Sequence, residues 1–296
     1  DERYLDHDSE RSPRAIDPWR LIPFVGLHLG CLAAFWTGIS VFALSLALLM
    51  YLARMFVITA FYHRFFSHRA FDSSRIFRFI VAILGCTAGQ RGPLWWASHH
   101  RQHHVHSDTE SDPHSPQIDS LFFSHTLWFM TRDAFPVRWR HIKDLQTYRE
   151  LIWLERFDWL PLLALAAGCF FLGEWTQANY PHWQTSGWQS LVWGFFISTT
   201  ALYHATYTIN SLAHRYGKRR FDTPDHSRNN VFLAILTLGE GWHNNHHRYP
   251  GAVRQGFYWW EIDVSYVGIK ILCLFGLVWN LRPVPSKILE AGRSKR

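Results

Sequence analysis

Two short stretches of this chain carry histidines at one repeated spacing. Among the histidines of residues 95–113, and again among those of residues 239–250, three stand at relative offsets of zero, three and four. Residues three and four apart share a helix face, so the imidazoles of each stretch can point into one volume. A buried imidazole has one hydrogen-bond donor and one acceptor, and both need partners. A metal ion can bind the acceptor nitrogens of several neighbouring rings at once. The spacing therefore predicts metal ligands, which are His100, His103, His104, His243, His246 and His247.

Other histidines extend this set. His63 and His68 stand five residues apart after a long apolar run, and five residues turn an α-helix by about 140° at ~3.6 residues per turn. The pair therefore need not share a face, and it would either reach two metals or straddle a helix end. His214 follows Asn210 by four residues in the sequence NSLAH, so both would lie on one helix face. The isolated histidines are interpreted as ordinary packing or surface residues: His7, His28, His99, His106, His114, His125, His141, His182, His204 and His226.

The nine candidate ligands are more than one metal ion can hold. Two ions, each taking four or five ring nitrogens and a water, would divide them. Imidazole ligands suit zinc, copper or iron, but zinc sites need only about three or four ligands, so nine histidines favour a redox pair such as two irons. Asn210 would hold a metal-bound water, unless it is an ordinary helix-surface amide. Glu240 and Asp108 would orient imidazoles, as carboxylates do around many metal sites.

The composition indicates a membrane protein. The 296 residues include 16 Trp and 23 Phe, and charged residues make up only 18%, which is low in charge and rich in aromatics for a soluble enzyme. The net charge of +7 does not indicate a nucleic-acid partner, because no Lys or Arg lies between Arg156 and Arg215. The four cysteines are far apart and lack the spacing of a metal site or a disulfide framework.

The apolar segments predict an all-α fold with four transmembrane helices in two hairpins. Residues 21–62 are long enough for two crossings of ~20 residues each, with a tight turn near Thr37 and Gly38. Residues 159–209 form the second hairpin, because two apolar runs flank a stretch with Trp and Tyr of the kind found at bilayer interfaces. Residues 71–90 would lie as a helix at the membrane interface, and residues 265–281 at the surface.

The polar segments place the histidines on one side of the membrane. After a polar N-terminal segment, 1–20, we expect a single domain, 21–296, in which segments 63–158 and 210–296 form a helical cap around the dimetal site. Nearly all Lys and Arg fall on this side, and the positive-inside rule makes it cytoplasmic. We expect a bacterial inner membrane, because the sequence shows neither an endoplasmic-reticulum retention tail nor a fused electron carrier.

The histidine motifs together resemble a known family. HRFFSH, HRQHH, NSLAH and GEGWHNNHH, with SDTESDPHSP at 107–116, are similar to the motifs of the membrane-bound di-iron fatty acyl desaturases of the stearoyl-CoA (acyl-CoA delta-9) type. The resemblance covers residues 58–250. It implies that the nine histidines bind two irons and that Asn210 contacts one iron through water.

The resemblance also bears on the substrate. Gln90, Trp96 and Thr206 match family residues that bend the substrate tunnel, which implies an acyl chain kinked beside the metals and desaturated near its ninth carbon; ordinary packing is the alternative for these three. Animal members recognise CoA phosphates with an Arg-Asp pair and a basic pair. This chain has Ser98 and His99 at the first position and PQID (116–119) at the second, which leaves the acyl carrier open.

We therefore expect an O₂-dependent oxidoreductase that introduces a cis double bond near carbon 9 of a saturated long-chain acyl-CoA. An acyl-lipid desaturase or a fatty acyl hydroxylase on the same di-iron scaffold is the nearest alternative. A histidine-rich metal transporter is the alternative from another class, although its ligands should lie near the bilayer midplane.

An unactivated C–H bond requires an oxidant made from O₂, and the two electrons must come from outside. The sequence carries no Rossmann fingerprint and no iron–sulfur cysteine set, so we expect an external donor of the cytochrome b5, ferredoxin or rubredoxin type. The donor would dock on a basic cytoplasmic surface, for which contact with anionic lipid is the competing interpretation. The residues of this surface are Arg132, Arg138, Arg140, Lys143, Lys218, Arg219 and Arg220.

Overall fold

The computed structural model describes residues 15–293, so most of the predicted N-terminal segment lies outside the described residues. The described chain is mostly helical, as predicted, with one antiparallel ribbon of β1 (Asp72–Ser73) and β2 (Val278–Trp279) and a few isolated bridges. The helices in chain order are α1 (Pro18–Cys31), α2 (Ala34–Thr37), α3 (Val41–Val57), η2 (Ile58–Ser67), α4 (Arg75–Cys86), α5 (Pro93–His106), η3 (Phe123–Leu127), η4 (Trp128–Met130), η5 (Trp139–His141), α6 (Arg149–Arg156), α7 (Trp159–Asn179), η6 (Pro181–Trp183), α8 (Gly187–Leu191), η7 (Val192–Ile197), α9 (Ser198–Ser211), η8 (Leu212–His214), α10 (Val231–Leu236), α11 (His243–Arg248), α12 (Val264–Leu274) and α13 (Ser286–Arg293).

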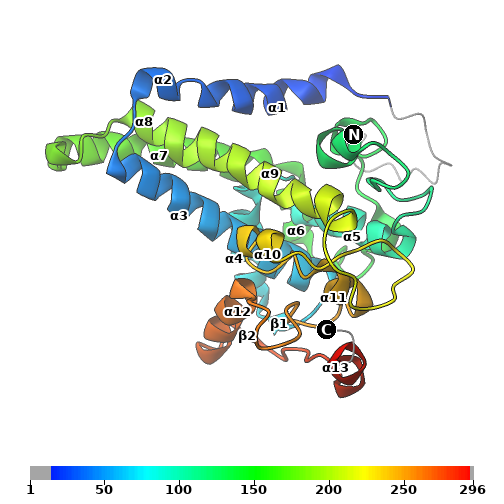
Figure 1. Ribbon diagram of the computed structural model, residues 1–296. Coiled ribbons are helices and arrows are strands. Elements are labelled where there is room, and N and C mark those ends of the chain that lie inside the picture. Colours follow the sequence, from blue (N-terminus) through cyan, green and yellow to red (C-terminus); the bar gives the residue numbers. More distant parts are fainter. Residues whose placement is uncertain (1–14, 294–296) are drawn as a thin grey trace.

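The first apolar segment reverses at Gly38, where the sequence predicts a turn. Gly38 has φ +67°, which glycine adopts without steric cost. Ser40 then caps α3 by accepting a hydrogen bond from the amide of Ala43 at 3.1 Å. In Figure 1, α1 and α3 are separate rods, and both contact the helix that contains η7 and α9.

The second apolar segment consists of α7 and one continuous helix, 187–211, made of α8, η7 and α9. Gly173 lets these two helices approach, because a Cβ there would lie 2.4 Å from the carbonyl oxygen of Ser186. Within residues 15–293, three helices are long and apolar enough to cross a membrane: Pro18–Thr37, Val41–Ser67 and Trp159–Asn179. Helix 187–211 is not among them, since hydroxyl residues interrupt its apolar run, and four crossings therefore stay a prediction.

A charged side chain is buried within α3. Arg54 on α3 is 4% exposed and donates to Thr87 O at 3.1 Å, Thr199 Oγ1 at 2.7 Å and Ser198 Oγ at 2.6 Å. A charged group in apolar surroundings is tolerated only when its donors are satisfied. These bonds hold α3 against α9 and against the turn that follows α4.

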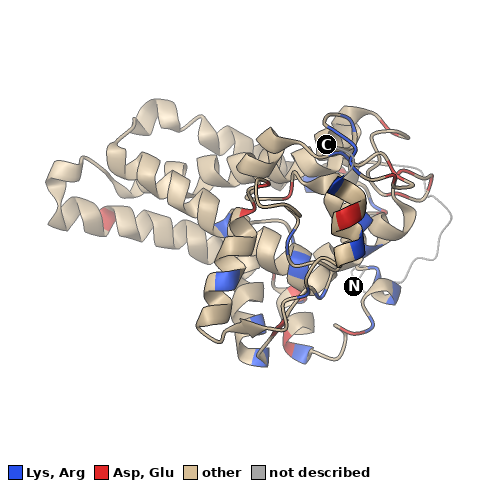
Figure 2. Ribbon diagram, turned by 60° about the horizontal axis from the view of Figure 1, so that its bottom comes forward, with Lys and Arg blue, Asp and Glu red and all other residues tan. Residues whose placement is uncertain are grey.

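The shorter helices gather at one end of the long ones (Figure 1). Lys and Arg lie mainly around this end in Figure 2, and the far ends of α7 and α8 carry none. The predicted interfacial segment 71–90 contains α4, whose exposed residues Ile76, Ile80 and Leu84 follow each other at intervals of four. Such a stripe is what a helix lying at a membrane surface presents to lipid.

The start of α5 is fixed by a side chain from another helix. The first amides of an α-helix have no partner within the helix, and those of Leu94 and Trp95 donate to Glu155 Oε2 on α6 at 2.9 and 3.1 Å. Gly92 makes room for this contact, because a Cβ there would lie 2.3 Å from the same oxygen. Helix α6 thereby positions α5, the helix that carries the first histidine cluster.

Candidate metal centre

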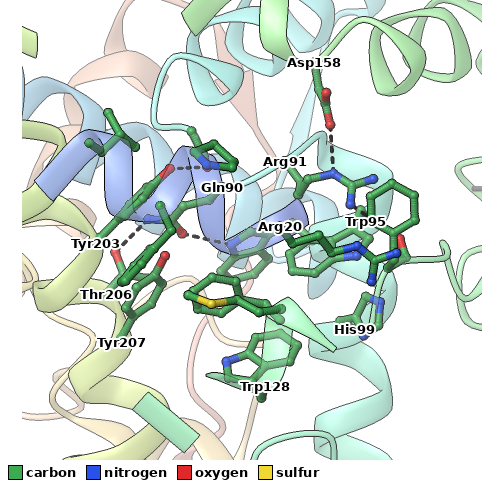
Figure 3. A pocket seen from close by; sticks show the side chains of 18 of the residues that line it. Arg20, Gln90, Arg91, Trp95, His99, Trp128, Asp158, Tyr203, Thr206 and Tyr207 are labelled. Atoms are coloured by element: carbon green, nitrogen blue, oxygen red, sulfur yellow. Dashed lines mark hydrogen bonds and ion pairs between the residues drawn. The ribbon is translucent and has the colours of Figure 1, made fainter. Parts of the chain in front are cut away.

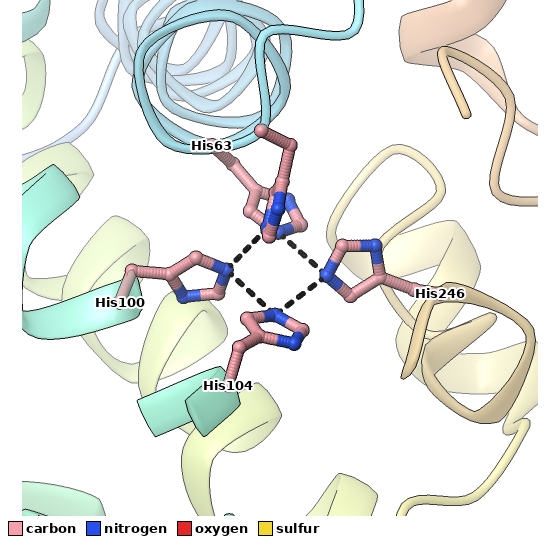
Figure 4. A group of neighbouring side chains, drawn as sticks. His63, His100, His104 and His246 are labelled. Atoms are coloured by element: carbon pink, nitrogen blue, oxygen red, sulfur yellow. Dashed lines mark hydrogen bonds between the residues drawn. The ribbon is translucent and has the colours of Figure 1, made fainter. Parts of the chain in front are cut away.

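Five of the predicted histidines converge where η2, α5 and α11 meet, and we call them the five-histidine group. One ring nitrogen of each lies within 4.8 Å of those of the other four: His63, His68, His100, His104 and His246. The Nε2 atoms of His68 and His100 are 2.8 Å apart, and those of His104 and His246 are 2.9 Å apart. Figure 4 shows four of these rings pointing toward one centre. A neutral imidazole has only one N–H, so facing nitrogens of this kind leave lone pairs directed inward.

The other four predicted histidines form a second cluster, the four-histidine group, from α5, η8 and α11. Its members are His103, His214, His243 and His247, again with ring nitrogens within 4.8 Å of one another. The Nε2 atoms of His214 and His243 are 3.0 Å apart. His247 Nε2 is buried and has no hydrogen-bond partner. The two groups adjoin, since the ring centroids of His104 and His247 are 4.4 Å apart.

The offsets of zero, three and four divide each helix between the two groups. In α5, His100 and His104 join the five-histidine group while His103 joins the other; in α11, His246 joins the five-histidine group while His243 and His247 join the other. At ~100° per residue, positions i and i+4 differ by about 40°, whereas i+3 lies about 60° to the other side. One helix therefore contributes ligands to two neighbouring sites. The spacing alone predicts that the three rings of each helix point into one common space.

His63 and His68 meet because η2 is a π-helix. Its hydrogen bonds run from residue i+5 to residue i, as in His68 N to His63 O at 3.2 Å, so residues five apart come together. The two ring centroids are 4.8 Å apart, and both rings belong to the five-histidine group. His68 directly follows the last helical residue, Ser67. The pair thus straddles a helix end, as one of the two sequence interpretations had it, and the two rings do not belong to different groups.

Four carboxylates fix the orientation of four of these rings. A carboxylate only accepts hydrogen bonds, so the ring nitrogen that contacts it, Nδ1, carries the proton and Nε2 keeps its lone pair for the cluster. The pairs are His63 with Glu240, His103 with Asp112 at 3.0 Å, His214 with Asp108 at 2.9 Å and His247 with Asp225 at 2.8 Å. Glu240 and Asp108 orient rings as the sequence predicts, whereas Asp112 and Asp225 were not foreseen.

Burial keeps most of the rings neutral. Burial, and then the neighbouring imidazoles, hold the pKa values of five of them well below the ordinary value: His68, His100, His104, His243 and His246. Burial also lowers the pKa of His247 to about 4, although Asp225 opposes the shift. For His103 burial acts in the same direction, but Asp112 and the other nearby aspartates outweigh it and raise its pKa. Neutral imidazoles with inward lone pairs are suitable ligands for a transition metal.

A cavity of about 390 Å³ lies against the five-histidine group. His100 and Asn210 belong to its lining. In the same lining Gln90 Nε2 donates to Thr206 Oγ1 at 3.0 Å (Figure 3). Trp96 Nε1 donates to Gln90 Oε1 at 3.3 Å, so these three residues form a polar belt on the wall. Aromatic side chains make up much of the remaining wall: Trp19, Phe24, Trp95, Trp128, Phe129, Phe135, Trp159, Tyr203 and Tyr207. Arg20, Arg91 and Asp158 add charged groups to the lining. A largely aromatic cavity with a limited number of polar and charged groups suits a long hydrocarbon chain that ends in a polar group.

Comparison with known proteins identifies the family. The family model for fatty acid desaturases matches residues 34–263. The chain belongs to the fatty acid desaturase family. This desaturase is 37% identical over 276 residues to an acyl-CoA 5-desaturase of Anemone leveillei, covering 92% of this chain and 81% of the relative.

Two further relatives differ from the first in their acyl carrier. An sn-1 stearoyl-lipid 9-desaturase of Anabaena variabilis is 33% identical over 267 residues, covering 89% of this chain and 93% of the relative. A hex-5-enoyl-[acyl-carrier protein] acetylenase of Moorena producens is 31% identical over 289 residues, covering 92% and 87%. The desaturase is thus an oxidoreductase of lipid metabolism, and its apolar helices are those of a membrane protein.

Ser98 and His99 of the desaturase are interior residues. Ser98 Oγ accepts from the amide of Arg138 at 3.1 Å, and His99 Nε2 donates to the carbonyl oxygen of Pro136 at 3.0 Å. Both residues therefore anchor the segment before η5. Arg138 itself is buried and paired with Asp133 at 2.9 Å, so its prediction as part of an exposed basic surface is wrong.

The rest of the predicted basic surface is exposed except at one position. Arg220 is half-buried and pairs with Glu261. The exposed members are Arg132, Arg140, Lys143, Lys218 and Arg219. A basic surface therefore remains, carried by fewer residues than the sequence predicts.

Several histidines interpreted as isolated have specific places in the desaturase. His114 lines the cavity and stacks on His103, with ring centroids 4.4 Å apart. His204 Nε2 lies 2.9 Å from His28 Nε2, and His204 Nδ1 lies 3.1 Å from His125 Nε2, which makes a chain of three imidazoles. The signal that could have found this chain is an ionisable residue inside an apolar helix, which is rare without a partner.

Proposed function

We propose that this chain is an integral-membrane, O₂-dependent desaturase in which two irons, held by nine histidines, introduce a cis double bond into a saturated long acyl chain. The observation that supports the proposal is the convergence of the nine ring nitrogens in adjoining groups of five and four beside an apolar cavity. Two sites of neutral imidazoles suit a pair of redox metals better than a structural zinc, which needs about four ligands at most.

Each predicted residue then has a role. The five-histidine group would hold one iron and the four-histidine group the other, with Asn210 contacting a metal through water. Asn210 lines the cavity, and it precedes His214 by four residues across the junction of α9 and η8. Gln90, Trp96 and Thr206 would hold the acyl chain bent beside His100, because their polar belt crosses the cavity wall at that point.

The protein would position the acyl chain beside the metals and exclude water from the reacting carbons. Bound iron would supply the oxidising power, drawn from O₂, that an unactivated C–H bond requires. The acyl chain loses two hydrogens, and with two electrons and two protons from outside, O₂ leaves as two waters. The aromatic wall would keep the reacting carbons in an apolar space, and the carboxylates that accept from Nδ1 would direct the Nε2 atoms of four rings toward the metals.

The acyl-CoA thioester is the substrate we propose, with the double bond near carbon 9. The named relatives include enzymes acting at carbon 5 and carbon 9, on CoA and on lipid, so an acyl-lipid substrate is the alternative for this chain. The transporter considered from the sequence is not favoured by the family match.

We further propose a single domain, 21–296, with four membrane crossings in two hairpins and the histidines in a cytoplasmic cap. The positive-inside rule supports this side, because the far ends of α7 and α8 lack Lys and Arg (Figure 2). An external donor of the cytochrome b5, ferredoxin or rubredoxin type would dock on the exposed basic residues of the cap. A bacterial inner membrane stays a prediction of the sequence, and the named relatives come from plants and bacteria.

Expression in a desaturase-deficient host, followed by mass spectrometry of total fatty acids, tests the proposal. We expect new cis-monoenoic acids with the double bond near carbon 9. A hydroxy acid in their place would identify a hydroxylase, and an unchanged fatty-acid profile in cells that accumulate the iron-loaded protein would refute desaturation. Supplying the purified protein with acyl-CoA and, separately, with acyl-lipid vesicles then decides the carrier.

A further inference from the structure

The two histidine groups differ in the charge that surrounds them. Three aspartates contact the four-histidine group, and each accepts from the Nδ1 atom of a different ring: Asp108, Asp112 and Asp225. The five-histidine group has one such contact, from Glu240 to His63. Among residues 15–293, no carboxylate accepts from the other four rings of that group.

The three aspartates are buried without a cation. Their side chains are 2%, 0% and 6% exposed for Asp108, Asp112 and Asp225. Within the described part of the chain none of them pairs with Lys or Arg, and their other bonds come from backbone amides and hydroxyl groups. Two further imidazoles lie within ion-pair distance: His226, half exposed, at 3.5 Å from Asp108, and His114, buried, at 3.9 Å from Asp112. Three nearly uncompensated negative charges thus face the four-histidine group.

The charge of Glu240 is shared with a cation. Arg64, fully buried, donates from Nη2 to Glu240 Oε1 at 3.0 Å and pairs at 3.0 Å with Asp263. Arg101 donates to the carbonyl oxygen of Ser67, directly before His68, at 2.8 Å. It shares Asp144 with Arg69, at 2.7 and 2.8 Å, so two cations on this side face one carboxylate, whereas Arg64 faces two. The surroundings of the five-histidine group are therefore close to neutral.

This difference has a consequence for bound metals. A metal that loses an electron gains a positive charge, which nearby buried carboxylates stabilise strongly because the interior screens charge weakly. A carboxylate on the far nitrogen of a ligating imidazole also makes that ligand more basic. Resting on the proposed di-iron function, we propose that Asp108, Asp112 and Asp225 are positioning residues that give the iron of the four-histidine group the lower reduction potential, so that it is oxidised first.

The number of carboxylates sets the expected difference in reduction potential. Carboxylate partners of metal-bound histidines typically contribute about tenfold to hundredfold to metal affinity, and we expect the smaller of these factors for the preference that each carboxylate gives to the ferric over the ferrous ion. A tenfold preference for the ferric ion corresponds to about 59 mV for one electron, and three such contributions amount to roughly a thousandfold, about 180 mV.

The two irons would also differ in their distance from the substrate. Among the rings of the two groups, only His100 of the five-histidine group lines the cavity. The iron beside the acyl chain is then the more oxidising one, and the aspartate-supported iron stands behind it.

The test is a redox titration of the purified full chain loaded with ⁵⁷Fe and followed by Mössbauer spectroscopy, which counts ferrous and ferric iron. The unchanged protein is expected to oxidise in two separate one-iron steps. Asp225→Asn keeps an acceptor for His247 Nδ1 and removes the charge, so it is expected to raise the lower midpoint by about 59 mV and leave the upper one in place. Asp225→Glu should restore the lower midpoint. Glu240→Gln, the matched control in the five-histidine group, is expected to move the upper midpoint alone.

Each result decides the matter. Two irons with one common midpoint would overturn the inference and leave the proposed function intact. The same conclusion would follow if Asp225→Asn shifted the upper midpoint, or if it shifted neither midpoint. If Asp225→Asn retains a single iron, its midpoint must equal the upper midpoint of the unchanged protein; the lower value would refute the assignment. An unchanged protein that holds fewer than two irons would overturn the proposed function itself.

Discussion

Replacement of Glu155 by glutamine is expected to change how protein stability depends on pH. The buried carboxylate of Glu155 accepts from the amides of Leu94 and Trp95 at the start of α5. Burial raises its pKa from 4.5 to about 7; Arg91 opposes this shift and Asp158 adds to it. Glutamine keeps an acceptor oxygen for the two amides and cannot ionise.

The raised pKa of Glu155 decides whether stability rises or falls with pH. Between pH 4.5 and about 7 the folded protein retains a proton on Glu155 that the unfolded chain has lost, so the free energy of unfolding falls as pH rises through this window and is constant above it. One pKa unit corresponds to about 1.36 kcal/mol, which makes the loss on the order of 3 kcal/mol. At roughly 2–4 °C per kcal/mol, the melting temperature of the E155Q variant should gain about 5–10 °C relative to the unchanged protein between pH 5 and pH 8.

Thermal unfolding of metal-free protein in detergent, measured from pH 5 to pH 8, checks this expectation. The difference between variant and unchanged protein cancels the titration of the histidine groups, which both contain. Glu150→Gln is the matched control on the same helix: the ion pair with Arg75, at 2.7 Å, lowers the pKa of Glu150, so this substitution should leave the slope above pH 5 unchanged. A parallel pH profile for E155Q and the unchanged protein would refute the role of burial at Glu155.

Three further outcomes are expected. Thr206→Val removes the acceptor of Gln90 Nε2, which costs roughly 1–3 kcal/mol and should spread the double bond over several positions, as gas chromatography of derivatised products would show. Arg64→Met strands two buried carboxylates, which costs about 3–5 kcal/mol and should lower the temperature of half-inactivation. His103→Ala should abolish turnover and reduce bound iron, measured by elemental analysis, whereas His182→Ala, at an exposed position, should change neither.

Controls separate these effects from general damage. Arg69→Met removes an exposed ion pair with Asp144 and should cost no more than about 1 kcal/mol, so equal losses for R64M and R69M would contradict the buried network. A single product isomer from T206V would show that the polar belt does not set the bend. Full iron content in H103A would count against the four-histidine group as a metal site.

The sequence predicts the histidine groups well because helical geometry links spacing to direction. Offsets of three and four identify the faces of α5 and α11 without any knowledge of the fold. The same reasoning does not divide the nine rings between two groups, since that division depends on how α5 and α11 face each other. It also leaves two alternatives open for the pair His63 and His68, because ~3.6 residues per turn does not hold in a π-helix and the sequence does not show that the segment is one.

The carboxylates illustrate what spacing cannot supply. Asp112 lies nine residues after His103, and Asp225 lies 22 residues before His247, so loops bring each to its ring and no periodicity marks them. The acidic segment that follows the first histidine cluster was the available signal for Asp112. Arg138 shows the converse error, because a charge in a polar segment was interpreted as exposed, whereas Asp133 and the segment before η5 bury it.

The π-helical geometry of η2 makes the number of residues between His63 and His68 a structural requirement. His63 must meet Glu240 while His68 meets His100, and the number of residues wound between them sets both directions. Removing or adding one residue there would rotate one ring out of the cluster, even if every remaining side chain were kept. Phe65 and Phe66, which lie between the two histidines, should accept other bulky apolar types. At these two positions a point substitution is therefore expected to disturb the cluster less than an inserted or deleted residue, whereas Arg64 is fixed by its two buried carboxylates.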